Sequence, residues 1–325
     1  MELLAAALTA ALADEVHDAD EETFLLYAQP ATSRDLGFVD PRVPSLSVAV
    51  AGRLVTVHQS PAVLASSRPG GTTGAVLWKV TPQLASWLAA PQNPLLALVL
   101  PPSASSILEL GCGISPLNAL ALRPRVAHYV LSDQVYVQKL LVQNLAEALD
   151  DAAPGPPKTA TPRRRARTTR KKAPAPVAAA VCCFRPLDWE TDAVTPALAA
   201  PRRSFDAVLS CDCVFNEALV APFVQTCVDV CGLRRRRRRR GRGAAADADS
   251  DGNGALDDGN GNGGAPCVCI VAQQLRSDDV FRAWLAAFHA AFRVWRVPPD
   301  MLPPELRPSA GFAIHVGILR DDDDE

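Results

Sequence analysis

Short apolar runs alternate with longer amphipathic stretches over most of this 325-residue chain. The runs have the length of buried strands and lie at 107–110, 127–131, 179–184, 205–211, 267–272 and 314–319. Between them, apolar residues recur three or four positions apart, which predicts helices at 116–123, 135–149, 218–231 and 279–292. This alternation predicts an α/β fold with a doubly wound, mostly parallel sheet.

The N-terminal part of the chain has a different pattern. Residues 1–30 predict a helix with several acids, and the alternation around Gly52 predicts a β-hairpin over 46–57. Two short helical segments are expected next, at 73–79 and 82–90. We therefore expect residues 1–70 to form a small N-terminal helix and hairpin extension, and residues 71–325 to form the main domain.

Composition changes abruptly at two places inside the expected main domain. Residues 151–178 are rich in proline, alanine and basic side chains, and residues 233–266 join seven consecutive arginines to a Gly/Asp/Asn tract. Such segments cannot bury a core, so both are expected to be disordered, solvated inserts. Their basic runs lack interleaved aromatic residues. Three interpretations of these runs therefore stay open: RNA contact, a nuclear address and a plain solvated loop.

Bulk composition limits the class of protein. Hydrophobic residues make up 48% of the chain and the formal net charge is −2, which allows a core and gives no global attraction to nucleic acid. The nine cysteines lie largely inside apolar runs, which indicates reduced thiols in a reducing compartment. We expect a cytoplasmic monomer, with a nuclear fraction as a second expectation. No apolar run is long enough for a membrane span, and the N-terminus lacks the basic region of a signal peptide.

The candidate chemistry begins where the run at 107–110 ends. Gly111 and Gly113 follow it directly, which predicts a sharp turn where a ligand can approach the backbone. Asp133 lies twenty residues after Gly113, behind the next run, where an acid suits the hydroxyls of a ribose. The sequence thus predicts a nucleoside cofactor at the carboxyl ends of these two strands.

Two further features distinguish between cofactors. Pro116 replaces the third glycine of the dinucleotide fingerprint, and Ser115 with Pro116 predicts a capped helix start. Glu109, just before the glycines, would repel a pyrophosphate but suits a cofactor that carries a sulfonium and an amino group. S-adenosylmethionine is therefore favoured over NAD, with Glu109 among the residues that bind it.

Asp212 is the candidate for the transfer chemistry. It follows the buried run at 205–211 and precedes Phe215. Methyl transfer to an amine is an in-line displacement that needs a positioned nitrogen and no metal. A strand-end acid can hold the incoming ammonium while a ring packs against the methylene stem. The alternative is that Asp212 caps the next helix and Phe215 belongs to the core.

Two tryptophans and four paired cysteines complete the candidates. Trp78 and Trp189 either stack on an adenine or belong to the core. The pairs Cys211–Cys213 and Cys267–Cys269 point to opposite faces of a strand, so no metal site is expected. Because the carboxyl ends of parallel strands share one edge of a sheet, the strand-end residues should converge on one crevice. These residues are Gly111, Asp133, Trp189 and Asp212.

These motifs together resemble the family-16 seven-strand protein methyltransferases. The resemblance is carried by Glu109-Leu110-Gly111-Cys112-Gly113, Asp133, Leu187-Asp188-Trp189 and Asp212-Cys213-Val214-Phe215. Flanking segments look like the fungal branch of that family that methylates a lysine of a large-subunit ribosomal protein. These segments include Leu36–Asp40, Gly71–Trp78 and Gly311–Leu319.

The resemblance implies a Rossmann-like seven-strand sheet, S-adenosylmethionine as cofactor and a lysine of a ribosomal protein as methyl acceptor. It implies lysine contacts from Asp212 and Phe215, and cofactor contacts from Trp78, Gly111, Gly113, Asp133, Trp189 and Cys211. One alternative is an RNA methyltransferase, although Cys213 and Val214 stand where nucleic-acid amino-methyltransferases prefer two prolines. Another is a non-catalytic protein of the same fold that docks on ribosome or RNA through its arginine runs.

Overall fold

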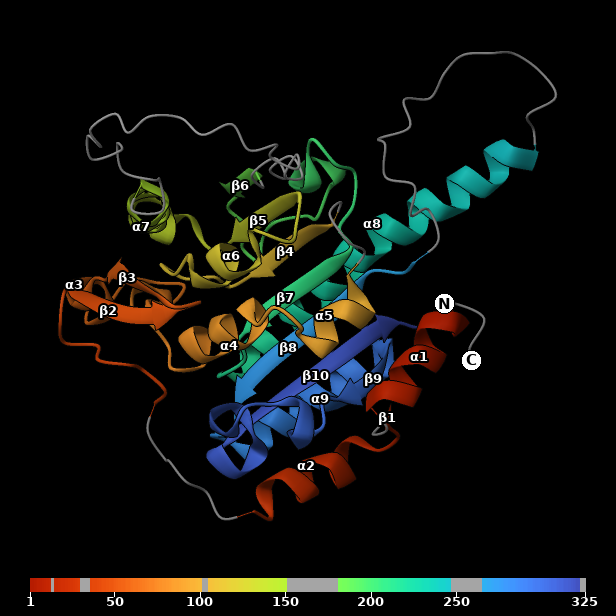
Figure 1. Cartoon of the computed structure of the whole chain (residues 1–325), viewed down its shortest axis with the longest axis horizontal. Helices are drawn as coiled ribbons and strands as arrows, with labels where there is room; N and C mark the ends of the chain where they lie inside the picture. Colours follow the sequence, from red (N-terminus) through yellow and green to blue (C-terminus); the bar gives the residue numbers. More distant parts are fainter. Residues whose placement is uncertain (13–14, 30–35, 101–104, 151–180, 247–264, 322–325) are drawn as a thin grey trace, which may run out of the picture.

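One mixed sheet organises the molecule (Figure 1). The computed structural model describes residues 1–12, 15–29, 36–100, 105–150, 181–246 and 265–321, with backbone alone for 236–246. The order of the eight strands is β1-β9-β10-β8-β7-β4-β5-β6. Their bounds are β1 Glu15–Val16, β4 Ser106–Leu110, β5 His128–Ser132, β6 Val181–Phe184, β7 Ala207–Cys211, β8 Val268–Gln274, β9 Phe292–Arg296 and β10 Phe312–Leu319.

The pairing confirms the doubly wound fold class. Strands β6, β5, β4, β7 and β8 pair in parallel, whereas β10 runs antiparallel to both β8 and β9. Strand β1 has two residues and adds to the edge at β9. Without it the sheet has the seven strands that the resemblance implies, six of which the apolar runs predicted. Since β4 and β7 are central neighbours, their carboxyl ends meet near the middle of one sheet edge.

Helices cover both faces of the sheet. Alternate side chains of β7 point to opposite faces, so Leu209 packs in one apolar cluster and Val208 in another. The first cluster includes residues of α1 (Glu2–Leu12), α4 (Val80–Ala89), α5 (Pro94–Val99), α6 (Leu117–Leu122) and α7 (Gln138–Asp150). The second includes residues of α2 (Ala19–Tyr27), α8 (Val220–Ala246) and α9 (Asp278–Ala291).

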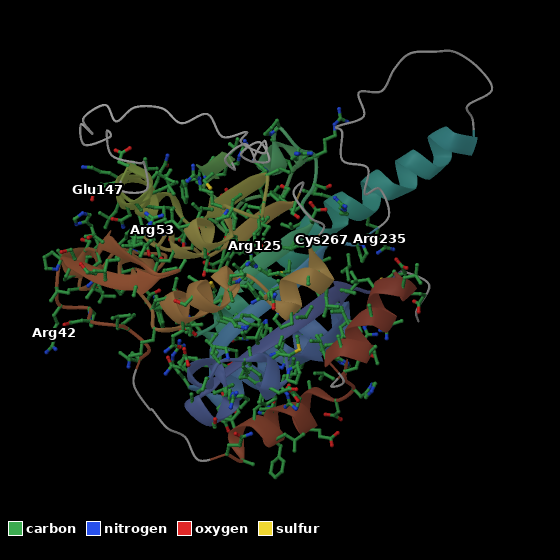
Figure 2. The ribbon with its side chains drawn as sticks, in the orientation of Figure 1. Arg42, Arg53, Arg125, Glu147, Arg235 and Cys267 are labelled. Carbon is green, nitrogen blue, oxygen red and sulfur yellow. The ribbon has the colours of Figure 1, made fainter. Side chains whose placement is uncertain are left out.

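The expected hairpin is present as β2 (Ser45–Val50) and β3 (Arg53–His58). Ala51 and Gly52 both take positive φ, 54° and 73°, as the two central residues of a tight hairpin turn of type I′ do. The hairpin packs beside α7, where the Arg53 guanidinium donates to the Ala148 carbonyl over 3.1 Å. Figure 2 shows Arg53 and Glu147 at this junction.

The single helix expected over residues 1–30 is wrong in one respect. It is divided into α1 and α2, because Glu15 and Val16 pair with Trp295 and Val294 of β9. Asp18 then caps α2 by accepting hydrogen bonds from two backbone N–H groups. The N-terminal segment therefore shares the main sheet, while a domain boundary at residue 70 stays a prediction.

One local expectation fails because a tertiary contact overrides the local pattern. The helix expected at 73–79 is only a 3₁₀ turn, Thr73–Ala75, because Trp78 forms a β-bridge with Phe38. The helix expected over 279–292 is present as α9, but the strand that follows it, β9, was not predicted. The other expected helices and strands are present with shifted ends, and α3 (Pro61–Leu64) and α5 are additions.

The start of the second expected insert is also different from the prediction. Helix α8 does not end at Cys231 but continues to Ala246, and Leu233 and Arg234 are buried. The Arg234 guanidinium pairs with Asp206 over 2.8 Å, and each side chain is only 4% exposed. The first arginine of the run is therefore part of the core at the amino end of β7. Residues 151–178 and 247–264 lie outside the described part of the chain.

Figure 2 shows Arg235 and Cys267 in this same region, far from the hairpin.

Within the described ranges, no helix has the length and apolar character needed to cross a membrane.

The substitution Arg234→Met should lower the free energy of unfolding by about 3–5 kcal/mol, because Asp206 would stay buried without its counter-charge. Urea unfolding followed by circular dichroism measures the loss. Arg282→Met is the matched control: Arg282 is 56% exposed and pairs with Asp279 on the surface of α9. Its loss should cost at most about 1 kcal/mol. Equal losses in both variants would contradict a special role for the buried pair.

Candidate functional site

A pocket lies at the carboxyl ends of β4, β5 and β7. It holds about 860 Å³ of space, including the part open to solvent at its mouth. Eight of the nine predicted site residues line it, and Glu109 does not. The eight are Trp78, Gly111, Gly113, Asp133, Trp189, Cys211, Asp212 and Phe215. The structure therefore brings the strand-end residues together in one crevice, as expected for a parallel sheet.

The loop after β4 needs glycine at two positions. Gly111 and Gly113 have φ of 68° and 56°, in the left-handed region. A Cβ at Gly111 would lie 2.4 Å from the Cys213 sulfur, and one at Gly113 would lie 2.9 Å from the Gly74 carbonyl oxygen. The glycines thus let the loop backbone itself form a wall of the pocket.

Asp133 holds this loop from the end of β5. Its Oδ2 accepts a hydrogen bond from the Gly113 N–H over 2.8 Å, and its Oδ1 accepts one from the Gln134 N–H over 2.7 Å. Burial raises the pKa of Asp133 to about 6, while the two backbone donors oppose that rise. Each carboxylate oxygen can accept a second hydrogen bond, so the group can also receive a ligand hydroxyl.

Glu109 lies beneath the loop and not on the pocket wall. It is 1% exposed and accepts hydrogen bonds from Asn118 over 2.8 Å and from the Tyr129 hydroxyl over 2.7 Å. Burial raises its pKa to about 7, and these two donors oppose the rise. Its side chain thus joins β4 to α6 and β5, and the structure does not bring it together with the other predicted cofactor residues.

The helix start beside the glycines is close to the expectation. Helix α6 begins at Leu117, one residue later than predicted, so that Pro116 and not Ser115 is at the cap position, and the Ser115 hydroxyl accepts from the Leu117 N–H over 3.4 Å. This helix positions Asn118, which holds the Glu109 carboxylate.

The predicted tryptophans and Cys211 all face the pocket. The Trp189 ring packs against Phe223 at 5.2 Å, and its Nε1 is buried without a hydrogen-bond partner among the described residues. Trp78 donates its Nε1–H to the Thr73 carbonyl over 3.1 Å. Burial raises the pKa of the Cys211 thiol well above its usual range, so that this part of the wall is uncharged.

Asp212 and Phe215 line the pocket just after β7. Asp212 has a φ of 59°, and its N–H donates to the Ala272 carbonyl over 2.7 Å. Its Oδ1 accepts from the Gln274 N–H over 3.1 Å, and its Oδ2 pairs with Arg276. Burial raises the pKa of Asp212, and Arg276 opposes that rise.

The alternatives for these two residues, a helix cap for Asp212 and a core position for Phe215, are wrong. The cap of the next helical turn is Asn216, whose side chain accepts from the Ala218 N–H, and not Asp212. Phe215 is 39% exposed and its ring stacks on Trp78 at 5.9 Å, so it is a wall of the pocket mouth and not a core residue.

Arg276 was missed by the sequence analysis. Its guanidinium lies 4.9 Å from the centre of the Trp78 ring and pairs with Asp212. The available signal was its position just after a strand, the same signal that identified Asp212. That strand was expected to end at 272, whereas β8 continues to Gln274 and brings Arg276 to the sheet edge.

Comparison with known proteins gives partial relatives. No family model matches the chain. It is 38% identical over 127 residues to diaminohydroxyphosphoribosylamino-pyrimidine deaminase of Schizosaccharomyces pombe, which covers 38% of this chain and 30% of that protein.

Two further relatives carry one name. The chain is 29% identical over 198 residues to ribosomal lysine N-methyltransferase 5 of Zygosaccharomyces rouxii, covering 53% of this chain and 58% of that protein. It is 29% identical over 234 residues to the protein of that name from Eremothecium gossypii, covering 64% and 68%. The chain thus spans less than two thirds of the length of the S. pombe and Z. rouxii proteins. The two proteins named ribosomal lysine N-methyltransferase 5 confirm the resemblance inferred from the motifs.

Solved structures with a similar backbone include methyltransferases. The chain has a TM-score of 0.35 and 10% identity to CurJ carbon methyltransferase, covering 68% of this chain and 50% of that one. It has a TM-score of 0.32 and 10% identity to a dimethyladenosine transferase from Plasmodium falciparum, covering 74% and 62%. These scores are low, and the fold assignment therefore rests on the strand order of the sheet.

The buried Glu109 should make stability depend on pH. Its folded pKa of about 7 lies above the ordinary value of 4.5, so its contribution to stability is lost as pH rises from 4.5 through 7. Glu109→Gln keeps the shape and removes the charge, so the unfolding free energy of this variant should fall less than that of the wild type between pH 5 and 8. Urea unfolding across this range measures the difference. Parallel curves would show that Glu109 is ionised without cost.

Proposed function

We propose that this chain is an S-adenosylmethionine-dependent protein-lysine N-methyltransferase whose substrate is a large-subunit ribosomal protein. The observation that carries the proposal is the pocket that gathers these residues. Asp133 follows β5 on one side of the glycine loop after β4, and Asp212 and Phe215 follow β7 on the other side. The two relatives named ribosomal lysine N-methyltransferase 5 support the choice of substrate.

The cofactor end suits a nucleoside. The positive φ of Gly111 and Gly113 leaves room that a Cβ would fill, so a ligand can lie against the backbone. Asp133 offers acceptor oxygens for ribose hydroxyls. The buried Nε1 of Trp189 has no partner among the described residues and can donate to a ligand. S-adenosylmethionine, when bound, supplies an electrophilic methyl group on a sulfonium.

The acceptor end suits a lysine side chain. Trp78, which the resemblance assigns to the cofactor, also forms an aromatic wall with Phe215 at the mouth, with ring centres 5.9 Å apart, against which a methylene stem can pack. The thiols of Cys211 and Cys213 are kept neutral because burial raises the pKa of both. The residues of this end orient the amine, which is what an in-line transfer requires.

The proposal also covers the location, the RNA contacts and the oligomeric state of the protein. A cytoplasmic location is supported by the nine free cysteines, seven of which are buried. We also propose that the arginine runs contact RNA weakly and that the protein is a monomer. The alternatives are an RNA methyltransferase and a non-catalytic binding protein, and the following two experiments separate all three.

Isothermal calorimetry with S-adenosylmethionine tests the cofactor. The wild type should bind it, and Asp133→Ala should weaken binding by at least roughly 1–3 kcal/mol, because a buried ribose hydroxyl would lose its acceptor and the Gly113 N–H would lose the carboxylate that holds the loop. Asp188→Ala is a useful comparison, because Asp188 lines the same pocket but its Oδ2 accepts from Gln134. The absence of any binding by the wild type at millimolar cofactor would reject the proposal.

Labelled methyl transfer tests the substrate and Asp212. Tritiated cofactor should label RNA-free large-subunit ribosomal proteins on lysine and leave separately supplied ribosomal RNA unlabelled. Asp212→Ala should lower turnover by ~10²-fold with nearly unchanged cofactor affinity, because it disturbs the acceptor end only. Asp279→Ala, at an 81% exposed side chain of α9, is the control and should keep full turnover. Label in RNA would favour the RNA methyltransferase, and no transfer despite cofactor binding would favour the binding protein.

A further inference from the structure

Arg276 is enclosed by three parts of the fold. It follows β8, and its side chain is 15% exposed, while the Asp212 side chain with which it pairs is 1% exposed. Its guanidinium also lies over the Trp78 ring at 4.9 Å. The third contact is Gly37, where an added Cβ would lie 3.1 Å from the Arg276 Nε.

These contacts fix the guanidinium in place. Gly37 has a φ of 87°, and its carbonyl accepts from the Lys79 N–H over 2.8 Å, which holds the backbone against Arg276. Asp212 is held in its positive-φ conformation by the 2.7 Å hydrogen bond to Ala272. A residue kept in such a conformation by its surroundings is typical of functional sites. The ion pair is thus a fixed part of the pocket wall, and Asp212 is not a free carboxylate.

We infer that Arg276 is a positioning residue for the methyl acceptor: by neutralising Asp212, it prevents the acceptor end from stabilising a protonated amine. The inference rests on the proposed lysine methylation and identifies the form in which the lysine is received. The lysine enters beside a neutral ion pair and an aromatic wall.

The chemistry explains why this matters. The lysine nitrogen must use its lone pair to form the new nitrogen–methyl bond as the sulfur–methyl bond breaks, and the bonding pair stays on sulfur. An ammonium has no free lone pair, so its proton must first pass to water. Free lysine has a pKa of about 10.4, and a nearby unpaired carboxylate would raise it further. A neutral pair removes that penalty.

Among the residues that the structure describes, few other charges face this ion pair. The thiols of Cys211 and Cys213 beside Asp212 stay neutral because burial raises their pKa. On the side of α2 and α9, Tyr27 and Asp278 face Arg276: burial raises the pKa of Tyr27, Asp278 adds to the rise, and Arg276 opposes it. At the cofactor end, the pKa of Asp133 is about 6 and that of Glu109 about 7, so both are largely ionised above pH 8 in every variant.

The test is the pH dependence of kcat for the full chain between pH 7 and 10, with tritiated cofactor and RNA-free large-subunit ribosomal proteins as the probe. Arg276→Gln should move the acidic limb to higher pH by about one unit or more, because the unpaired Asp212 carboxylate then stabilises the ammonium. Asp212→Asn should move the limb to lower pH, because the unpaired guanidinium repels the ammonium. Arg276→Lys keeps the charge and should restore the wild-type limb.

Opposite shifts in the two variants distinguish charge from structural damage, because damage alone would not reverse the direction. Arg282→Gln, at an exposed position of α9, is the control and should leave the limb unmoved. Cofactor calorimetry confirms that each variant is folded; if Arg276→Gln is not, a downward shift in Asp212→Asn supports the inference. Unmoved limbs, or shifts in the same direction, would overturn it while the proposed function stands. A wild type that labels no protein would overturn both.

Discussion

The hydrogen bond between the Gly113 N–H and the Asp133 carboxylate is the constraint on which the pocket depends. It joins the loop after β4 to the end of β5 over 2.8 Å, and it keeps Gly113 at a φ of 56°. Burial raises the pKa of Asp133 to about 6, so the carboxylate is mainly ionised at neutral pH and accepts this bond in its stronger, charged form. The same acid can therefore shape the loop and receive a ligand hydroxyl.

The two ends of the pocket use different physical means. The cofactor end is built mainly from backbone, because glycine at 111 and 113 allows close approach. The acceptor end is built from side chains, with the Asp212–Arg276 ion pair and the ring of Trp78 in contact. Backbone gives a close fit to a ligand of constant shape, whereas a charge pair adjusts the electrostatic environment of a group that can be protonated.

The N-terminal segment supports the acceptor end although it lies far away in sequence. Glu22 of α2 accepts from Arg296 of β9 and contacts His315 of β10, both over 2.9 Å. Farther along, Phe38 packs edge-on against Trp78 at 4.6 Å. The segment is thus tied to the sheet by a buried charge network and touches the pocket wall through an aromatic contact. Substitutions in this segment should therefore affect the Trp78 ring.

Local physics determined much of this protein from its sequence alone. The apolar runs predicted the parallel strands, and the positions of Gly111, Gly113, Asp133 and Asp212 at strand ends predicted one crevice, because strand ends in such a sheet share an edge. Turn chemistry around Gly52 likewise predicted the hairpin. These features depend on neighbours within a few residues, or on a general rule of sheet architecture.

Only the tertiary structure decided which partners the charged side chains take. Glu109 turned toward Asn118 and Tyr129, and Arg234, the first of a run expected to be solvated, entered the core beside Asp206. Arg276 met Asp212 from 64 positions away along the chain. A buried charge must find a counter-charge or hydrogen bonds, but the pattern of apolar residues does not reveal which distant group supplies them, because packing of whole elements sets that distance.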